Sequence, residues 1–158
     1  MQLIGMLDSP FVRRVAVTLR LLELSYEHSN WSVGNDAERI RRFNPLGRVP
    51  ALVLDDGEVL IDSAAILDHL DEVAGARALL PRSGAARRRA LQLMAMATGA
   101  ADKGVAQLYE RAFRPEDKRH APWVARCRTQ VDLALAALDA ACASAGPWLV
   151  EGRMTHAE

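Results

Sequence analysis

A proline directly in front of an apolar run is the feature that most constrains the fold of this chain. Pro50 precedes the run at residues 51–54, and because it lacks a backbone N–H it fits the first position of a strand better than a central one. X-Pro bonds alone adopt the cis form at modest cost, so we predict a cis Val49-Pro50 bond that leaves the N–H and C=O of Val49 unpaired. Such a residue can pair with an extended peptide ligand. An equally simple interpretation is that Pro45 and Pro50 only bracket a loop between a helix and this strand.

The first half of the chain predicts strands and helices in alternation. An apolar run at residues 2–7 is followed by Ser9-Pro10, which indicates a buried strand and then a helix with Ser9 as its cap and Pro10 at its first position. Residues 55–57, Asp-Asp-Gly, indicate a tight hairpin between two antiparallel strands. The expected order is strand 2–7, helix 10–22, strand 25–33, helix 37–43, strand 51–54, strand 58–61 and helix 63–75, which is βαβαββα.

Beyond residue 75 the pattern becomes wholly helical. Two long helices are expected at 86–114 and 122–146, since apolar residues recur there at spacings of three and four. The predicted fold class is therefore α/β plus all-α. It comprises a domain at 1–75, a linker at 76–86 and a helical domain at 87–158. Residues expected on the buried helix faces include Val73, Leu108, Cys127, Leu135 and Cys142.

Charge and composition exclude several classes of function. Twenty basic residues balance twenty acidic ones, so no overall field attracts nucleic acid or an anionic membrane. No apolar run approaches the roughly 20 residues that a membrane span needs, and no secretory signal is recognisable at the start, which favours a cytoplasmic protein. The four histidines and two cysteines lie at spacings that fit no metal site, so we expect no metal.

Three motifs together resemble those of the glutathione transferase family. Residues 44–52 are similar to the segment before that family's third strand, residues 9–15 to the start of its first helix, and Asp62-Ser63 to its acidic-serine pair. The resemblance covers residues 1 to about 75 well and the helical remainder loosely. It implies a thioredoxin-like domain that binds glutathione, an all-helical second domain, and a homodimer.

The resemblance also implies a role for each motif residue. Val49, next to Pro50, would pair its backbone with the cysteinyl unit of glutathione, and Arg48 could reach the glycyl carboxylate. Asp62 would receive the ammonium group, and Ser63 would hold the γ-glutamyl carboxylate with its hydroxyl and N–H. The starts of the first and third helices favour anions on physical grounds as well, because unpaired N–H groups and the positive dipole end lie there. Taken alone, the acidic-serine pair would be no more than a helix cap.

Ser9 is the candidate for activating the glutathione thiol. A hydroxyl that donates to sulfur beside a helix start stabilises the thiolate, and a free thiol with a pKa near 8.5 is only a few per cent ionised at neutral pH. A thiol pKa lowered by about two units would make the thiolate dominant. Two features oppose this role: Ser9 caps its own helix, and the neighbouring Asp8 carboxylate would raise the thiol pKa. The absence of Cys at position 9 argues against a mixed disulfide with glutathione there.

These inferences predict a transferase that adds the glutathione thiolate to an apolar electrophile, as in detoxification. The alternative is a transferase-like module that binds glutathione, or a protein partner, without significant turnover. Thr155 and Glu158 have capping-box spacing for a helix that would continue beyond residue 158. We therefore also expect these 158 residues to be part of a longer natural protein, or a fragment whose helical domain is supported by association.

Overall fold

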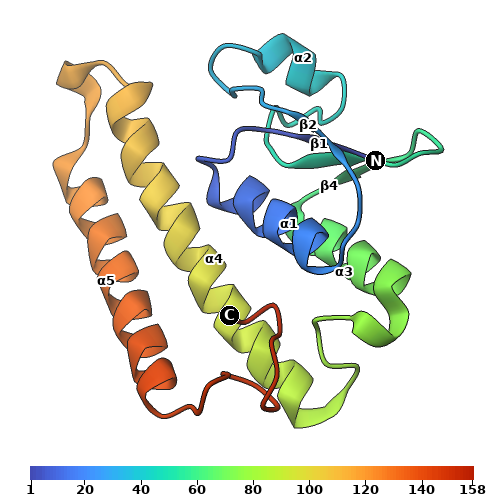
Figure 1. The fold of residues 1–158 in the computed structure, drawn as a ribbon. Helices are drawn as coiled ribbons and strands as arrows, with labels where there is room; N and C mark the ends of the chain where they lie inside the picture. The colour runs from blue at the N-terminus through green and yellow to red at the C-terminus, as the bar shows by residue number, and fades with distance from the viewer. The chain divides into compact units, whose positions relative to one another are not determined.

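The computed structural model describes all residues, 1–158, and the chain divides into two compact units, Met1–Ala78 and Leu79–Glu158 (Figure 1). The first unit holds a four-stranded sheet and three α-helices. In chain order its elements are β1 (Gln2–Ile4), α1 (Pro10–Leu21), β2 (Glu27–Ser29), α2 (Ala37–Arg41), β3 (Ala51–Val53), β4 (Val59–Ile61) and α3 (Ser63–Ala74), followed by a 3-10 turn at Gly75–Arg77. The predicted βαβαββα order is confirmed.

The sheet has the strand order β2-β1-β3-β4. Strand β1 is parallel to β2 and antiparallel to β3, and β3 is antiparallel to β4, as the hairpin signal predicts. In this register Ile4 lies opposite Ala51, and Ala51 lies opposite Ile61. The end of β1, the start of β3 and the end of β4 therefore meet at one end of the sheet.

Apolar residues cover both faces of the sheet. Successive side chains of a strand point to opposite faces, so Leu3 and Leu52 share one face while Ile4 and Ala51 share the other. All four are fully buried, and Ile40 of α2 packs with Ile4 and Ala51. Helices α1 and α3 contact each other, and each contacts a strand of the sheet. This packing holds the starts of both helices in fixed positions relative to the strands.

Three features of this unit differ from the prediction. Strand β1 ends at Ile4 and not at residue 7, because the chain leaves the strand conformation at Gly5, whose φ is +129°. Strand β2 contains three residues, because Trp31 and Val33 pack as a loop against the apolar cluster around Ile40 instead of continuing the strand. The prediction that Val73 is buried is wrong: it is exposed, and Asp71 is buried in its place on the last turns of α3. The buried face of α3 thus turns toward Asp71, which lies four residues after the buried Leu67.

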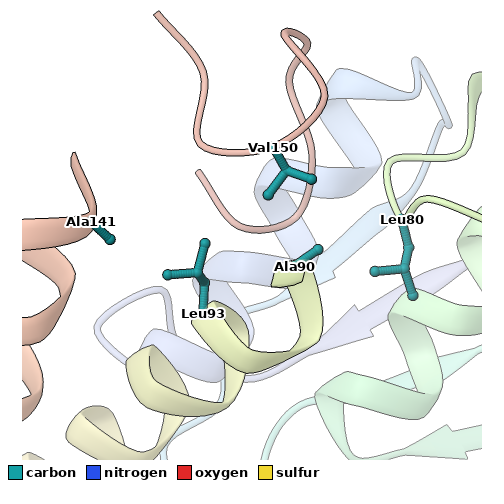
Figure 2. Packing of buried hydrophobic residues seen from close by; sticks show 5 residues of the cluster. All are labelled: Leu80, Ala90, Leu93, Ala141 and Val150. Carbon is teal, nitrogen blue, oxygen red and sulfur yellow. The ribbon is translucent and has the colours of Figure 1, made fainter. Parts of the chain in front are cut away.

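The second unit is built on a pair of helices. Helix α4 (Gly84–Ala112) and helix α5 (Ala121–Ala143) contact each other, and a 3-10 turn at Glu116–Lys118 lies between them. A small apolar core joins the start of α4 to the end of α5 and to the segments that flank them. Figure 2 shows its five buried members, Leu80, Ala90, Leu93, Ala141 and Val150.

The helices of this unit bury less than the sequence predicts. Helix α4 begins at Gly84, inside the segment expected to be a linker. None of the helices has both the length and the apolar character that a membrane span requires. Cys127 is buried as expected, but the same prediction for Leu108, Leu135 and Cys142 is wrong, because these side chains are exposed. Within the unit α4 and α5 have only each other as long neighbours, so only the stripe of each that faces the other is covered.

A buried carboxylate fastens the connection between the two helices. Glu110, near the end of α4, is only 6% exposed. One of its oxygens accepts from the backbone N–H of His120, at the start of α5, at 2.9 Å, and the other lies 3.1 Å from Nε of Arg114. Arg119 donates to the carbonyls of Arg111 and Arg114 at the end of α4. Glu110 thus supplies a partner for an otherwise unpaired N–H at a helix start, where a negative charge is favoured.

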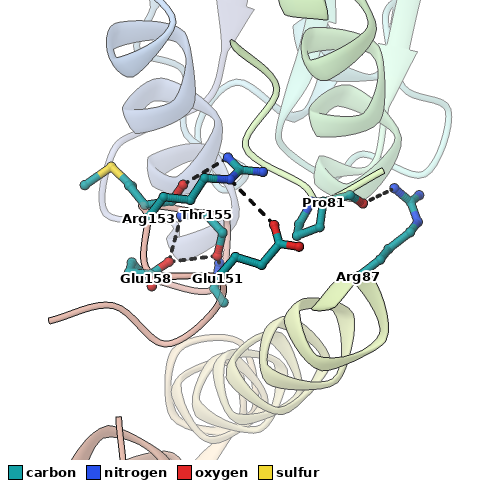
Figure 3. Close-up of polar contacts among 8 residues, drawn as sticks. Pro81, Arg87, Glu151, Arg153, Thr155 and Glu158 are labelled. Atoms are coloured by element: carbon teal, nitrogen blue, oxygen red, sulfur yellow. Dashed lines mark hydrogen bonds and ion pairs between the residues drawn. The ribbon is translucent and has the colours of Figure 1, made fainter. Parts of the chain in front are cut away.

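The predicted capping contacts between Thr155 and Glu158 are present (Figure 3). One Glu158 carboxylate oxygen accepts from both the N–H and the hydroxyl of Thr155 at 2.8 Å, and the Thr155 hydroxyl oxygen accepts from the N–H of Ala157 at 3.1 Å. The other oxygen accepts from the N–H of Leu149 at 2.7 Å. Burial raises the pKa of Glu158, but the hydrogen bonds from Thr155 and Leu149 outweigh it and hold the pKa below its ordinary value.

Candidate functional site

The strand register brings the three sequence motifs to one end of the sheet. Ser9 follows β1, Val49 precedes β3, and Asp62-Ser63 follow β4. The last residues of β1 and β4 both lie directly opposite the first residue of β3 in the sheet. Residues separated by more than 50 positions in the sequence therefore lie around one place. No single motif could indicate this proximity, because it depends on how the strands pair.

Gly5 allows the segment that carries Val49 to approach the start of α1. A Cβ atom at Gly5 would lie 2.5 Å from Cγ2 of Val12 and 2.8 Å from Cβ of Val49, and Gly5 has a φ of +129°. Only a residue without a Cβ fits there. The Gly5 N–H donates to the Ser29 carbonyl at 2.9 Å, which holds this contact in place from the β2 side.

The Val49-Pro50 bond is cis, as predicted, and the backbone of Val49 makes no hydrogen bond within the chain. The side chain of Asn44 shapes the loop that leads to it. This buried amide donates to the Arg48 carbonyl at 2.9 Å and accepts from the N–H of Leu46 at 3.0 Å. Arg48 itself is exposed at the surface. The unpaired N–H and C=O of Val49 are thus presented by a loop whose preceding turn is fixed.

Asp62 and Ser63 form the start of α3. Asp62 is the N-cap, with a φ of +66°, and its carboxylate accepts from the N–H of Ala64 at 2.8 Å. The N–H of Ser63 has no partner within the chain. The Ser63 side chain is only 3% exposed, and its hydroxyl oxygen accepts from Nη1 of Arg14 at 3.4 Å. An unpaired N–H, a hydroxyl and a helix start can together bind a carboxylate.

Arg14 is the main site residue that sequence reasoning missed. The pattern of α1 places it on a polar face, where a solvated arginine is expected, but the structure places it beside Ser63 of α3. Burial lowers the pKa of Arg14, and the negative charge of Asp62 opposes that shift. The guanidinium stays protonated at any pH at which the protein is folded. No signal within the helix identifies this role, because it depends on how α1 and α3 pack.

Ser9 lies at the start of α1 and caps it. Its hydroxyl oxygen accepts from the N–H of Val12 at 3.4 Å, a long contact, and its carbonyl accepts from the N–H of Arg13 at 2.9 Å. Capping occupies the lone pairs of the hydroxyl oxygen, so the Ser9 proton can still be donated to a sulfur atom. Asp8, the other feature that opposed this role, is exposed at the surface. The cap alone therefore does not prevent the predicted role of Ser9.

Comparison with known proteins identifies the family. Residues 3–78 match the family model described as "Glutathione S-transferase, N-terminal domain". The chain is also 32% identical over 139 residues to the uncharacterized GST-like protein YibF of Escherichia coli K12, covering 88% of this chain and 68% of that protein. The chain belongs to the glutathione transferase family. Its first unit is accordingly the thioredoxin-like domain of a glutathione transferase, and its second belongs to the helical domain.

Solved structures of this transferase family resemble the chain closely. A glutathione S-transferase from Methylobacterium radiotolerans, in complex with glutathione sulfonate, is 29% identical, with a TM-score of 0.91 over 99% of this chain and 73% of that one. A glutathione transferase family member from Pseudomonas fluorescens with bound glutathione is 39% identical, with a TM-score of 0.78 over 88% of this chain and 70% of that one. The chain thus spans about seven-tenths of each of these relatives.

Proposed function

We propose that this transferase-family chain binds glutathione at the end of the sheet where its three motifs meet, and conjugates the glutathione thiol to an apolar electrophile. The observation that carries the proposal is the register in which the residues flanking β1, β3 and β4 become neighbours. It places an unpaired backbone edge between two helix starts. The glutathione that is bound to the Pseudomonas fluorescens relative supports the same ligand here.

The chemistry of the tripeptide fits the groups at this place. The N–H and C=O of Val49 would pair with the cysteinyl unit as an added strand does. The hydroxyl and N–H of Ser63 would bind the γ-glutamyl carboxylate, and the Asp62 carboxylate would bind the ammonium group beside it. Arg48, which is exposed, would attract the glycyl carboxylate. Each charged group of glutathione then has a partner of opposite charge or a hydrogen-bond donor.

Ser9 would stabilise the reacting sulfur. Its hydroxyl donates to the thiolate, whose proton is released to solvent, and the positive end of α1 adds a favourable field. The thiolate then attacks the electrophilic carbon, a carbon–sulfur bond forms, and the leaving group departs with the electron pair of its bond to carbon. No cofactor enters this sequence, because glutathione itself is the second substrate.

Two assays on the same preparation test the proposal. We expect the protein to be retained on immobilised glutathione, to be eluted by free glutathione, and to convert a chloronitroarene faster than the solution reaction does. Ser9→Ala should keep its affinity and lose turnover, whereas Ser25→Ala, at an exposed serine of the same unit, should change neither. Retention without turnover would favour a binding module in place of an enzyme, and failure to bind glutathione would contradict the proposal.

Two further expectations concern assembly, which rests on the family resemblance, and cellular location. We propose that the protein is a homodimer and acts in the cytoplasm. Light scattering that gives the mass of a monomer at micromolar concentration would contradict the first. Recovery of the native protein outside the cytoplasmic fraction of its source cells would contradict the second.

A further inference from the structure

His28 joins the edge strand β2 to the residue that follows β1. Its side chain is exposed, yet its Nε2 lies 2.7 Å from the carbonyl oxygen of Gly5. The carbonyl of Ser29, the next residue of β2, accepts from the N–H of Gly5 at 2.9 Å. Gly5 is buried, and no other donor of the chain is bonded to its carbonyl. His28 therefore supplies the partner that a buried backbone carbonyl needs.

The direction of this hydrogen bond is fixed by chemistry. A carbonyl oxygen only accepts, so Nε2 of His28 must carry the proton. Nε2 carries a proton in the imidazolium ion and also in one of the two neutral tautomers. The bond can therefore form in either charge state of the ring. This indicates that His28 holds the backbone and does not transfer protons.

Gly5 is a point at which the backbone needs to be held. Its φ of +129° belongs to a region that glycine enters easily, and a residue without a Cβ leaves the peptide group after it free to rotate. The carbonyl that His28 binds belongs to that peptide group, which joins Gly5 to Met6. Fixing the carbonyl fixes the orientation of the whole group, because a peptide group is planar.

The same peptide group leads to Ser9. The carbonyl of Met6 accepts from the N–H of Ser9 at 3.2 Å, which closes a turn directly in front of α1. A rotation of the peptide group between Gly5 and Met6 would displace this turn and the Ser9 hydroxyl with it. The hydrogen bond from His28 opposes such a rotation from the β2 side.

We propose that His28 is a positioning residue for Ser9, which it holds in place through the peptide group between Gly5 and Met6. The inference rests on the proposed function, in which Ser9 stabilises the glutathione thiolate. It assigns His28 no contact with glutathione. The groups proposed for the charged γ-glutamyl end lie at the start of α3, so loss of His28 should change the state of the sulfur more than the affinity for glutathione.

Two replacements of His28 test this role. Phenylalanine keeps a ring and lacks the donor, whereas the side-chain amide of glutamine can donate from nearly the position of Nε2. His28→Phe should lower kcat about fivefold and raise the pKa of the bound glutathione thiol by about half a unit, while the Kd for glutathione changes less than about twofold. His28→Gln should recover most of both effects. If the Phe variant does not fold, His28→Asn replaces it, because its amide is about one bond too short.

A role that acts through Ser9 should vanish when Ser9 is absent. In a Ser9→Ala background, His28→Phe should lower kcat by less than about twofold, whereas a general loosening of the unit would lower it about fivefold in both backgrounds. Glu27→Gln, at an exposed residue of the same strand, is the control and should change none of these values. Equal losses of kcat in both backgrounds would overturn the positioning role.

Amide hydrogen exchange tests the same link in the protein without a ligand. His28→Phe should speed exchange of the Ser9 N–H about fivefold and leave the amides of α3 unchanged, because only the turn in front of α1 is released. Unchanged exchange at Ser9 would overturn the inference. If the unaltered protein does not bind glutathione, the proposed function fails, and the exchange measurement still decides whether His28 holds Ser9.

Discussion

Replacing Gly5 by Ala tests the close approach that brings Val49 to the start of α1. The new Cβ would lie 2.5 Å from Val12 and 2.8 Å from Val49, both much shorter than an ordinary contact. Neither valine can withdraw easily, because Val12 is fully buried and a β-branched side chain has few alternative rotamers. The substitution therefore strains the backbone at Gly5 and forces two neighbouring segments apart.

The two effects are of similar size and can be added. An alanine held at the φ of +129° that Gly5 adopts costs about 1–3 kcal/mol of stability. Overpacking against the two valines costs about another 1–3 kcal/mol. The sum of about 2–6 kcal/mol is a large part of the 5–15 kcal/mol by which domains are usually stable. Movement of Val49 should also weaken glutathione binding under conditions in which the variant is folded.

Gly57 provides the matched control for this experiment. It also has a positive φ, +91°, but a Cβ there would meet no atom within 4 Å. Gly57→Ala therefore includes the backbone strain and excludes the overpacking. Urea unfolding of both variants should show that Gly5→Ala is about 1–3 kcal/mol less stable than Gly57→Ala. Equal stability of the two variants, or unchanged glutathione affinity in Gly5→Ala, would refute this account of the site.

Three other predictions concern single polar groups. Ser63→Ala should raise the Kd for glutathione by at least about fivefold with little change in kcat, whereas Ser9→Ala should lower kcat by at least about fivefold. Unchanged steady-state kinetics in Ser9→Ala would exclude a catalytic role for Ser9. Glu110→Ala should lower the free energy of unfolding by about 1–3 kcal/mol in urea titrations, because the N–H at the start of α5 loses its partner; an unchanged midpoint would count against that cap. Glu158→Gln should destabilise the protein only at higher pH. The pKa of Glu158 is lowered in the folded protein, so the contribution of this carboxylate to stability is complete above the ordinary value of 4.5 and is lost as the pH falls through the folded value. A difference in melting temperature between the variant and the unaltered protein that stays the same across that pH range would contradict this prediction.

Local sequence signals predicted most of the first unit. Ser9-Pro10 specified a helix start and Pro50 the start of a strand, because caps and prolines act through their immediate neighbours. The hairpin was equally local, since the Asp-Asp-Gly turn fixes how β3 and β4 pair. These same positions carry the candidate site, and its residues were named from the sequence because the motifs there resemble those of the glutathione transferase family.

Features that depend on packing could not be predicted in this way. The spacing that placed Arg14 on a polar face is correct for the helix alone, but α3 lies against that part of α1 and makes it a site residue. Asn44 was inside a recognised motif, yet its role in holding the loop before Val49 depends on two backbone partners that only the fold brings near. For Leu108 and Leu135, periodicity identified apolar positions but could not show how much of each helix a neighbour covers.

The central claim is that the end of the sheet binds glutathione and stabilises its thiolate through Ser9. The most direct measurement is the thiol pKa of bound glutathione, obtained from the ultraviolet absorbance of the thiolate as the pH is varied. Our account predicts a pKa well below the value near 8.5 of a free thiol, and a return toward that value in Ser9→Ala. A bound thiol whose pKa equals or exceeds that of free glutathione would contradict the claim.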